Sequence, residues 1–132
     1  MIRGIGMDLV EISRVQSFME GQSGDRFVSR VLTAGEQMLV SERKNRAAEF
    51  VAGRFAAKEA VVKALGTGIG ATVGLHDIEV LPDPSGKPVV NLSPGALERL
   101  GYGSDDLKLH LSITHTRDYA AAYAVAETAD GM

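Results

Sequence analysis

The feature that most constrains this chain is a long helical pattern, which begins near Asn45 and ends at Leu65. At about 100° per residue, its large apolar side chains fall on one arc of the helix surface. They are Phe50, Val51, Phe55, Val61, Val62 and Leu65. Gly66 follows, and glycine is the residue expected where a helix ends in the left-handed conformation. The pattern predicts a central helix with one buried face, against which the rest of the chain packs.

Four ionisable side chains border or enter this apolar arc. Arg54 and Lys58 project inside it, while Glu59 lies at its edge. An ion on a buried face costs several kcal/mol unless it is paired or its charged end reaches water. We therefore interpret Arg54, Lys58, Glu59 and Lys63 as the wall of a polar cleft that binds an anion. The alternative for Arg54 and Lys58 is that their long stems carry the charges out to solvent.

Glu59 and Lys63 are four residues apart and are therefore neighbours on a helix surface. This spacing allows a divalent cation on the carboxylate and a phosphate oxygen on the ammonium to lie side by side. The alternative is an ordinary exposed pair, worth about 0.2 to 0.5 kcal/mol of helix stability.

Composition excludes several classes of protein. The length of 132 residues predicts one domain, residues 1–132. The longest apolar run, residues 119–126, is far shorter than the roughly 20 residues that cross a bilayer. The absence of cysteine excludes disulfides, thiolate zinc sites and thiol nucleophiles, and it fits a reducing compartment. A net charge of -3 without a basic run argues against a general nucleic-acid binder. We expect a cytoplasmic protein.

The first residues alternate in the manner of a strand, with one face nearly bare of side chains. Ile5, Met7 and Leu9 share one face, and Gly4, Gly6 and Asp8 share the other. Glycine within a strand marks the close approach of a ligand or another backbone. Asp8, at the end of the bare face, is therefore a candidate metal ligand. The alternative is that Asp8 is the N-cap of the helix that begins near Ile12.

The remaining patterns predict an α+β domain, with one mainly antiparallel sheet packed against the long central helix. A capping box at Thr33 and Glu36 opens a short helix, and Ser93-Pro94 opens another. A glycine-rich loop from Gly66 to Gly74 follows the long helix. The predicted elements are helices at 25–32, 33–42 and 94–100, a hairpin at 76–81 and 88–92, and strands at 107–114 and 119–126.

Several segments together closely resemble one known family, bacterial holo-[acyl-carrier-protein] synthase. They are the segments Gly4–Val10, Arg54–Gly68, Gly86–Pro88 and His110–Thr116, in matching order and spacing. The resemblance implies the 4'-phosphopantetheinyl transferase fold. It also implies transfer of 4'-phosphopantetheine from coenzyme A to a serine of apo acyl carrier protein. The products would be holo-carrier protein and adenosine 3',5'-bisphosphate, in support of fatty acid biosynthesis.

The resemblance also assigns roles to residues. Asp8 and Glu59 would hold Mg²⁺ at the pyrophosphate of coenzyme A, which suits an ion that takes one or two carboxylates. Lys63 would stabilise or protonate the leaving phosphate. Either Glu59 or a metal-bound water would accept the serine proton. The residues expected to bind the nucleotide are Arg54, Lys58, Gly66, Thr67, Gly68, Pro88, His115 and Thr116.

Family members of this size are trimers with active sites between subunits, so we expect a homotrimer. A partner subunit would pack on the bare Gly4 and Gly6 face and on the small residues of the final strand. The resemblance places carrier-protein docking at Arg14, Arg26, Phe27 and Arg30. Three cations and an aromatic side chain suit an acidic partner. The nearby acids Glu20 and Asp25 dilute this basic patch.

Two other functions are compatible with part of these observations. A binding module would recognise coenzyme A or another nucleotide without chemistry. A structural domain would carry a solvated helix. Asp8, Glu59 and Lys63 argue against the first, because a pure binder needs no metal at the pyrophosphate. The charges on the apolar arc argue against the second.

Overall fold

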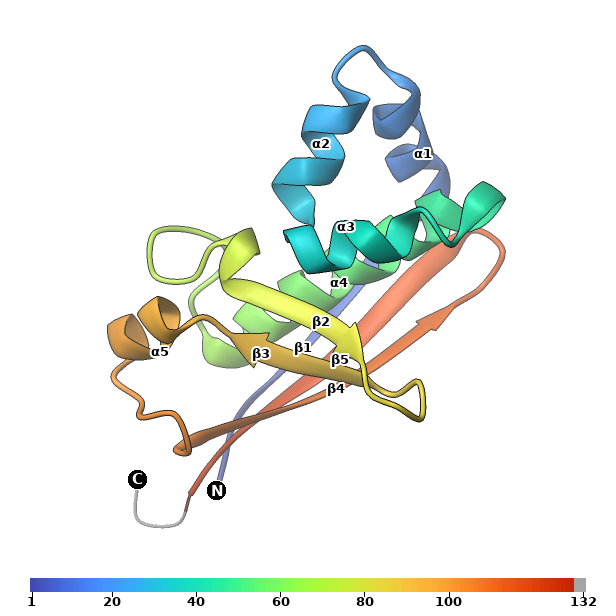
Figure 1. Ribbon diagram of the computed structural model, residues 1–132. Coiled ribbons are helices and arrows are strands. Elements are labelled where there is room, and N and C mark those ends of the chain that lie inside the picture. The colour runs from blue at the N-terminus through green and yellow to red at the C-terminus, as the bar shows by residue number, and fades with distance from the viewer. Residues whose placement is uncertain (130–132) are drawn as a thin grey trace.

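The computed structural model describes residues 1–129, and residues 130–132 of the predicted domain lie outside them. Within this range, helices and two antiparallel sheets surround one long helix, α4 (Figure 1). The elements are β1 (Ile2–Glu11), α1 (Ile12–Glu20), α2 (Gly24–Val31), α3 (Ala34–Val40), η1 (Lys44–Arg46), α4 (Ala47–Leu65), η2 (Leu75–Asp77), β2 (Ile78–Pro82), β3 (Pro88–Leu92), α5 (Pro94–Leu100), β4 (Leu107–His115) and β5 (Tyr119–Thr128).

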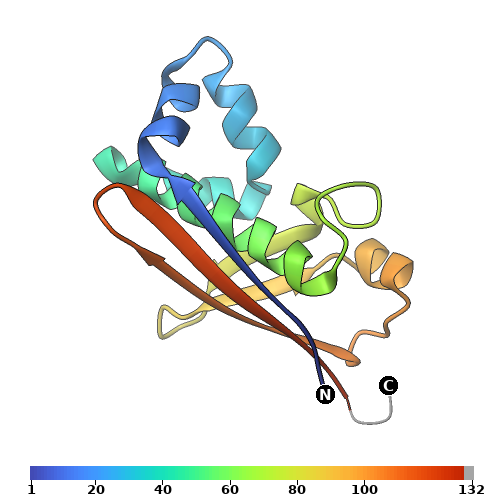
Figure 2. The same ribbon diagram turned by 180° about the vertical axis from the view of Figure 1, so that it is seen from behind.

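The α+β prediction is confirmed, although the strands form two antiparallel sheets rather than the single sheet expected, and α4 is the central layer. A three-stranded sheet of order β1-β5-β4 covers one side of α4, and the β2–β3 hairpin and α3 cover the other (Figures 1 and 2). The prediction of a single buried arc is wrong, because α4 is buried on nearly every side. Its small residues, such as Ala52, Ala56 and Ala60, allow both layers to approach closely. No helix of the described residues is long and apolar enough to span a membrane.

Local signals located the ends of the elements well. Thr33 and Glu36 form the predicted capping box of α3. Gly66 ends α4 with φ +78°, and its N–H donates to the carbonyls of the last turn. Ser93 caps α5 as expected, since its hydroxyl accepts from the Ala96 N–H at 3.1 Å.

The bare face of β1 lies directly against the backbone of α4. A Cβ atom at Gly4 would collide with the Ala64 carbonyl oxygen, and one at Gly6 with that of Ala60. The close approach predicted from these glycines is therefore made by α4 of the same chain. The expectation that a partner subunit packs on this face is wrong, because the face is already filled.

The opposite face of the sheet is the open one. In Figure 2 no other element of residues 1–129 lies over it. Its exposed large apolar side chains come from β1 and β5, and they are Ile5, Met7, Leu9, Tyr119 and Tyr123. An apolar sheet face of this kind is typical of an interface.

Candidate active site

Asp8, Glu59 and Lys63 come together where β1 crosses α4. The tight Gly4 and Gly6 contact holds β1 on the helix, and Asp8 follows at the same face of the strand. Lys63 Nζ lies 3.1 Å from Asp8 Oδ1 and donates to the Met7 carbonyl oxygen at 3.0 Å. The N-cap of α1 is Glu11, so the alternative role of Asp8 as a helix cap is excluded.

The electrostatics of this group favour a cation. Burial is the main cause of a raised pKa at Glu59, and the negative charge of Asp8 adds to it. The positive charge of Lys63 partly opposes both. Only Asp8 is paired with the Lys63 ammonium, which is itself about half exposed, so the Glu59 carboxylate lies beside this pair without an ion-pair partner of its own in the described part of the chain. No third histidine or acid of residues 1–129 joins them in a metal-binding cluster. The pair of carboxylates fits Mg²⁺, which takes one or two carboxylates and completes its shell with phosphate and water.

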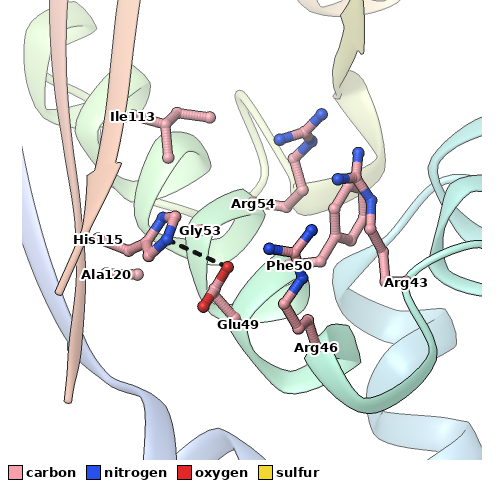
Figure 3. A pocket seen from close by; sticks show the side chains of 9 residues that line it. All are labelled: Arg43, Arg46, Glu49, Phe50, Gly53, Arg54, Ile113, His115 and Ala120. Atoms are coloured by element: carbon pink, nitrogen blue, oxygen red, sulfur yellow. Dashed lines mark ion pairs between the residues drawn. The ribbon is translucent and has the colours of Figure 1, made fainter. Parts of the chain in front are cut away.

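A second polar region lies between the start of α4 and the β4–β5 turn. It is a cavity of about 140 Å³ lined by Arg43, Arg46, Glu49, Phe50, Gly53, Arg54, Ile113, His115 and Ala120 (Figure 3). The guanidinium groups of Arg43 and Arg54 both stack on the Phe50 ring, at 4.8 and 4.4 Å from its centre. His115 Nε2 lies 3.2 Å from Glu49 Oε1. Three arginines face one carboxylate, so this cationic pocket suits an anion.

Two features strengthen that reading of the cationic pocket. Arg43 Nε is buried and has no hydrogen-bond partner in the described part of the chain, and a buried donor without an acceptor is costly. Burial lowers the pKa of Arg54, Glu36 opposes this and Arg43 adds to it, so a bound anion would favour the charged form of Arg54. Arg54 and His115 were predicted from the sequence, whereas Arg43 and Arg46 were not. The only available signal was the local run Arg43-Lys44-Asn45-Arg46.

Lys58 does not line a cleft, and both readings of it from sequence are wrong. Its side chain is fully buried, so the charge does not reach solvent. Nζ lies 2.7 Å from Glu36 Oε1 and donates to the carbonyl oxygens of Val31 at 2.7 Å and Leu75 at 3.0 Å. An ammonium has three donors, and all three are used. Burial lowers the pKa of Lys58, while the hydrogen bond to Glu36 opposes that shift. No donor is left for a phosphate.

The glycine-rich loop follows α4 directly. Gly66 and Gly68 have positive φ, and a Cβ there would meet nothing within 4 Å, so open space surrounds the loop. Its far end is anchored, because Arg99 Nε donates to the Thr72 carbonyl oxygen at 2.8 Å. Arg99 also lies 3.0 Å from Asp77. Burial raises the pKa of Asp77. Hydrogen bonds from Ser93 and Gly74 and the charge of Arg99 outweigh this and hold the pKa below its usual range.

With this geometry established, comparisons with known proteins decide the family. The model of the 4'-phosphopantetheinyl transferase superfamily matches residues 4–124. The chain belongs to this superfamily. A holo-[acyl-carrier-protein] synthase of Clostridium tetani is 49% identical over 127 residues, which cover 96% of this chain and 97% of the relative. One of Geobacillus sp. is 44% identical over 128 residues, covering 96% and 98%.

Solved structures of the superfamily agree. The holo-(acyl-carrier-protein) synthase of Bacillus anthracis, in complex with CoA (3',5'-ADP), has a TM-score of 0.82 and 42% identity and covers 98% of this chain and 99% of its own. The Neisseria meningitidis synthase has a TM-score of 0.85 and 34% identity, with 97% and 100% covered. This chain is therefore an enzyme of the holo-[acyl-carrier-protein] synthase type and has the superfamily fold.

The other residues expected from the resemblance are spread over the molecule. Pro88 faces Pro82 in the β2–β3 hairpin, and neither it nor the glycine loop lines the cationic pocket of the same chain. Thr116 lies in the β4–β5 turn beside His115, and its hydroxyl accepts from the Tyr119 N–H at 3.1 Å. Within one chain, the expected nucleotide-binding residues therefore form separate groups.

The expected docking residues lie on α1 and α2, and Arg14, Arg26 and Arg30 are all exposed. Arg14 and Phe27 line a groove of about 450 Å³ that also includes Asp8, Phe18 and Phe55. The rings of Phe18 and Phe27 stack with their centres 5.2 Å apart. A largely apolar groove that includes the exposed Arg14 thus begins at Asp8.

Proposed function

We propose that this chain transfers 4'-phosphopantetheine from coenzyme A to a serine hydroxyl of an apo acyl carrier protein and releases adenosine 3',5'-bisphosphate. The family and the names of the relatives support the reaction. The observation that carries the proposal is the group of Asp8, Glu59 and Lys63, in which the partly exposed ammonium pairs with Asp8 and the Glu59 carboxylate beside them has no ion-pair partner among residues 1–129. Residues 1–132 act as one domain in the cytoplasm and serve fatty acid biosynthesis.

Asp8 and Glu59 would hold Mg²⁺, which supplies positive charge against the pyrophosphate of coenzyme A. Lys63 is held at Asp8 by the Met7 carbonyl, with its ammonium about half exposed, and is therefore available to the leaving phosphate. Either Glu59 or a water at the site would accept the serine proton. The serine oxygen forms the new bond to phosphorus. The broken bond leaves its electron pair on the bisphosphate oxygen, which Lys63 stabilises.

The cationic pocket of Arg43, Arg46, Arg54 and His115 would bind a phosphate of the nucleotide. The unpaired buried Nε of Arg43 supports this, since an anion would supply its missing acceptor. Binding there holds the nucleotide end of coenzyme A, while the reacting phosphorus lies at Asp8 and Glu59.

We propose a homotrimer in which the open sheet face is the contact. The exposed Ile5, Met7, Leu9, Tyr119 and Tyr123 support association through this face. The active site then lies between copies. The glycine loop and Pro88 of one copy face the cationic pocket of the next, which explains why they are separate within one chain. Size-exclusion chromatography with light scattering should give three times the chain mass, and a monomer would contradict this part.

The groove from Asp8 to Phe27 would receive the carrier protein. Its apolar floor and the exposed Arg14, Arg26 and Arg30 suit a partner with an acidic helix around an apolar residue. The acceptor serine is thereby brought to Asp8.

Intact-protein mass spectrometry tests the reaction. An apo acyl carrier protein is incubated with this protein, coenzyme A and Mg²⁺, with and without EDTA. The expected result is a mass gain of one phosphopantetheine, which EDTA suppresses. Binding of coenzyme A without any gain on fatty-acid, polyketide or peptidyl carriers would instead support the binding module.

A further inference from the structure

The ammonium of Lys58 joins three segments that are far apart in the sequence. Its acceptors are the Val31 carbonyl at the end of α2, Glu36 in α3 and the Leu75 carbonyl directly after the glycine loop. The contacts are 2.7, 2.7 and 3.0 Å. Lys58 itself lies on α4, next to Glu59.

Glu36 extends these connections to the other layer. Its Oε1 also accepts from the Thr33 N–H at 2.8 Å, and its Oε2 accepts from the Val80 N–H of β2 at 2.7 Å. Both members of the pair are fully buried. A buried ion pair adds little stability beyond that of a well-packed apolar pair. Directional hydrogen bonds, however, fix the relative positions of elements in a way that apolar contacts do not.

We propose that Lys58 is a positioning residue that fixes α2 and the glycine loop relative to the helix that carries Glu59. The residues of α2 proposed to dock the carrier are Arg26, Phe27 and Arg30, and α2 ends at the Val31 carbonyl. The loop proposed to face the nucleotide ends at the Leu75 carbonyl. One buried ammonium thus sets the position of both substrate-binding segments. This inference rests on the proposed transfer reaction.

The contact of β1 with α4 does not depend on Lys58, because it is made by Gly4 and Gly6. Loss of the ammonium should therefore weaken substrate binding more than the chemical step. We expect the KM values for coenzyme A and for the carrier each to rise about tenfold, the effect of losing one buried hydrogen bond. The kcat should change by less than about threefold.

The decisive variant is the double substitution Lys58→Met with Glu36→Gln. It removes both buried charges, so its melting temperature should return close to that of the wild type. A positioning role predicts that both KM values stay raised in this stable protein. If Lys58 serves stability alone, both KM values return to wild-type levels, and the proposal is overturned.

Two further measurements keep the test decisive. Val62→Ala, a core truncation elsewhere on α4, should lower the melting temperature without raising either KM. Lys58→Arg keeps a charge opposite Glu36 but not the three-acceptor geometry. It should raise both KM values, and it serves if the double variant fails to fold. Amide hydrogen exchange should increase at residues 24–33 and 66–75 in both Lys58 variants, while unchanged exchange there would overturn the proposal.

Failure of this inference is distinguishable from failure of the proposed reaction. Absence of transfer by the wild type would overturn the reaction. Transfer by the wild type, with unchanged KM values in the double variant, would overturn the role of Lys58 alone.

Discussion

Lys58 and Glu59 are neighbours on α4, yet their environments are opposite. The ammonium of Lys58 is fully buried and uses all three of its donors. The carboxylate of Glu59 is only partly buried, makes no hydrogen bond or ion pair with residues 1–129, and has a raised pKa. A buried charge with every bond satisfied holds structure together, whereas one left without partners beside a second carboxylate is prepared for a ligand.

The largest effect on stability should come from breaking the buried pair. Lys58→Met leaves the Glu36 carboxylate buried without its cation and should cost about 3 to 5 kcal/mol of unfolding free energy. Denaturant unfolding measures this loss. A cost below about 1 kcal/mol, the size found for exposed pairs, would contradict the contrast between the two sites.

A large effect on the reaction, without loss of fold, is expected for Asp8→Asn. Removal of one carboxylate from a site that has two should reduce Mg²⁺-dependent transfer by about a hundredfold, since the metal supplies several kcal/mol of charge stabilisation. Initial rates over a range of Mg²⁺ concentrations measure the effect. Circular dichroism should be unchanged, because the only ion pair that Asp8 loses within residues 1–129 is with the half-exposed Lys63. A wild-type transfer rate of this variant at ordinary Mg²⁺ concentrations would show that Asp8 is not part of the metal site.

A smaller effect is expected in the cationic pocket. Arg43→Met removes the unpaired buried donor and one of three guanidinium groups. The KM for coenzyme A should rise about tenfold, the effect of a lost charged hydrogen bond, with little change in kcat. Arg117→Met, on the neighbouring turn but outside the cavity lining, is the matched control and should leave the KM unchanged. Equal increases in the KM for coenzyme A in the two variants would mean that the pocket contributes only its overall positive charge.

The smallest expected effect is the change in protein stability caused by Glu59→Gln. Because folding raises the pKa of Glu59, the folded wild type binds this proton more tightly than the unfolded chain does. Its stability therefore falls as pH rises through the window from the ordinary glutamate pKa of 4.5 to the folded pKa. Without Mg²⁺, Glu59→Gln should be slightly more stable above that window and equal below it. Thermal melts at several pH values in EDTA test this, and a less stable variant at neutral pH would contradict it.

Sequence reasoning succeeded where the signal is local. The capping box at Thr33, the left-handed Gly66 and the Ser93 cap each depend on a few adjacent residues. The bare Gly4 and Gly6 face correctly predicted a close approach, although α4 rather than a partner makes it. Asp8 and Glu59 were named together through the family resemblance, because no local pattern joins residues so far apart.

Predictions from the sequence failed where the environment of a residue depends on an element that packs over it from elsewhere in the chain. Lys58 and Glu36 are 22 residues apart, and nothing in the helical pattern of α4 indicates that α3 covers this side. The predicted single apolar arc failed for the same reason, since alanines such as Ala56 and Ala60 pack against the neighbouring layers. Arg43 and Arg46 precede α4 in a turn and a short 3₁₀ helix, so no regular period relates them to Arg54.

The contrast between Lys58 and Glu59 is tested most directly by the transfer rate of Glu59→Gln. The assay is mass-spectrometric detection of carrier modification at saturating coenzyme A, carrier and Mg²⁺. We expect a fall of about a thousandfold, which corresponds to the several kcal/mol that a metal ion contributes, with the melting temperature maintained. A rate within about threefold of the wild type would show that the free carboxylate has no part in the reaction.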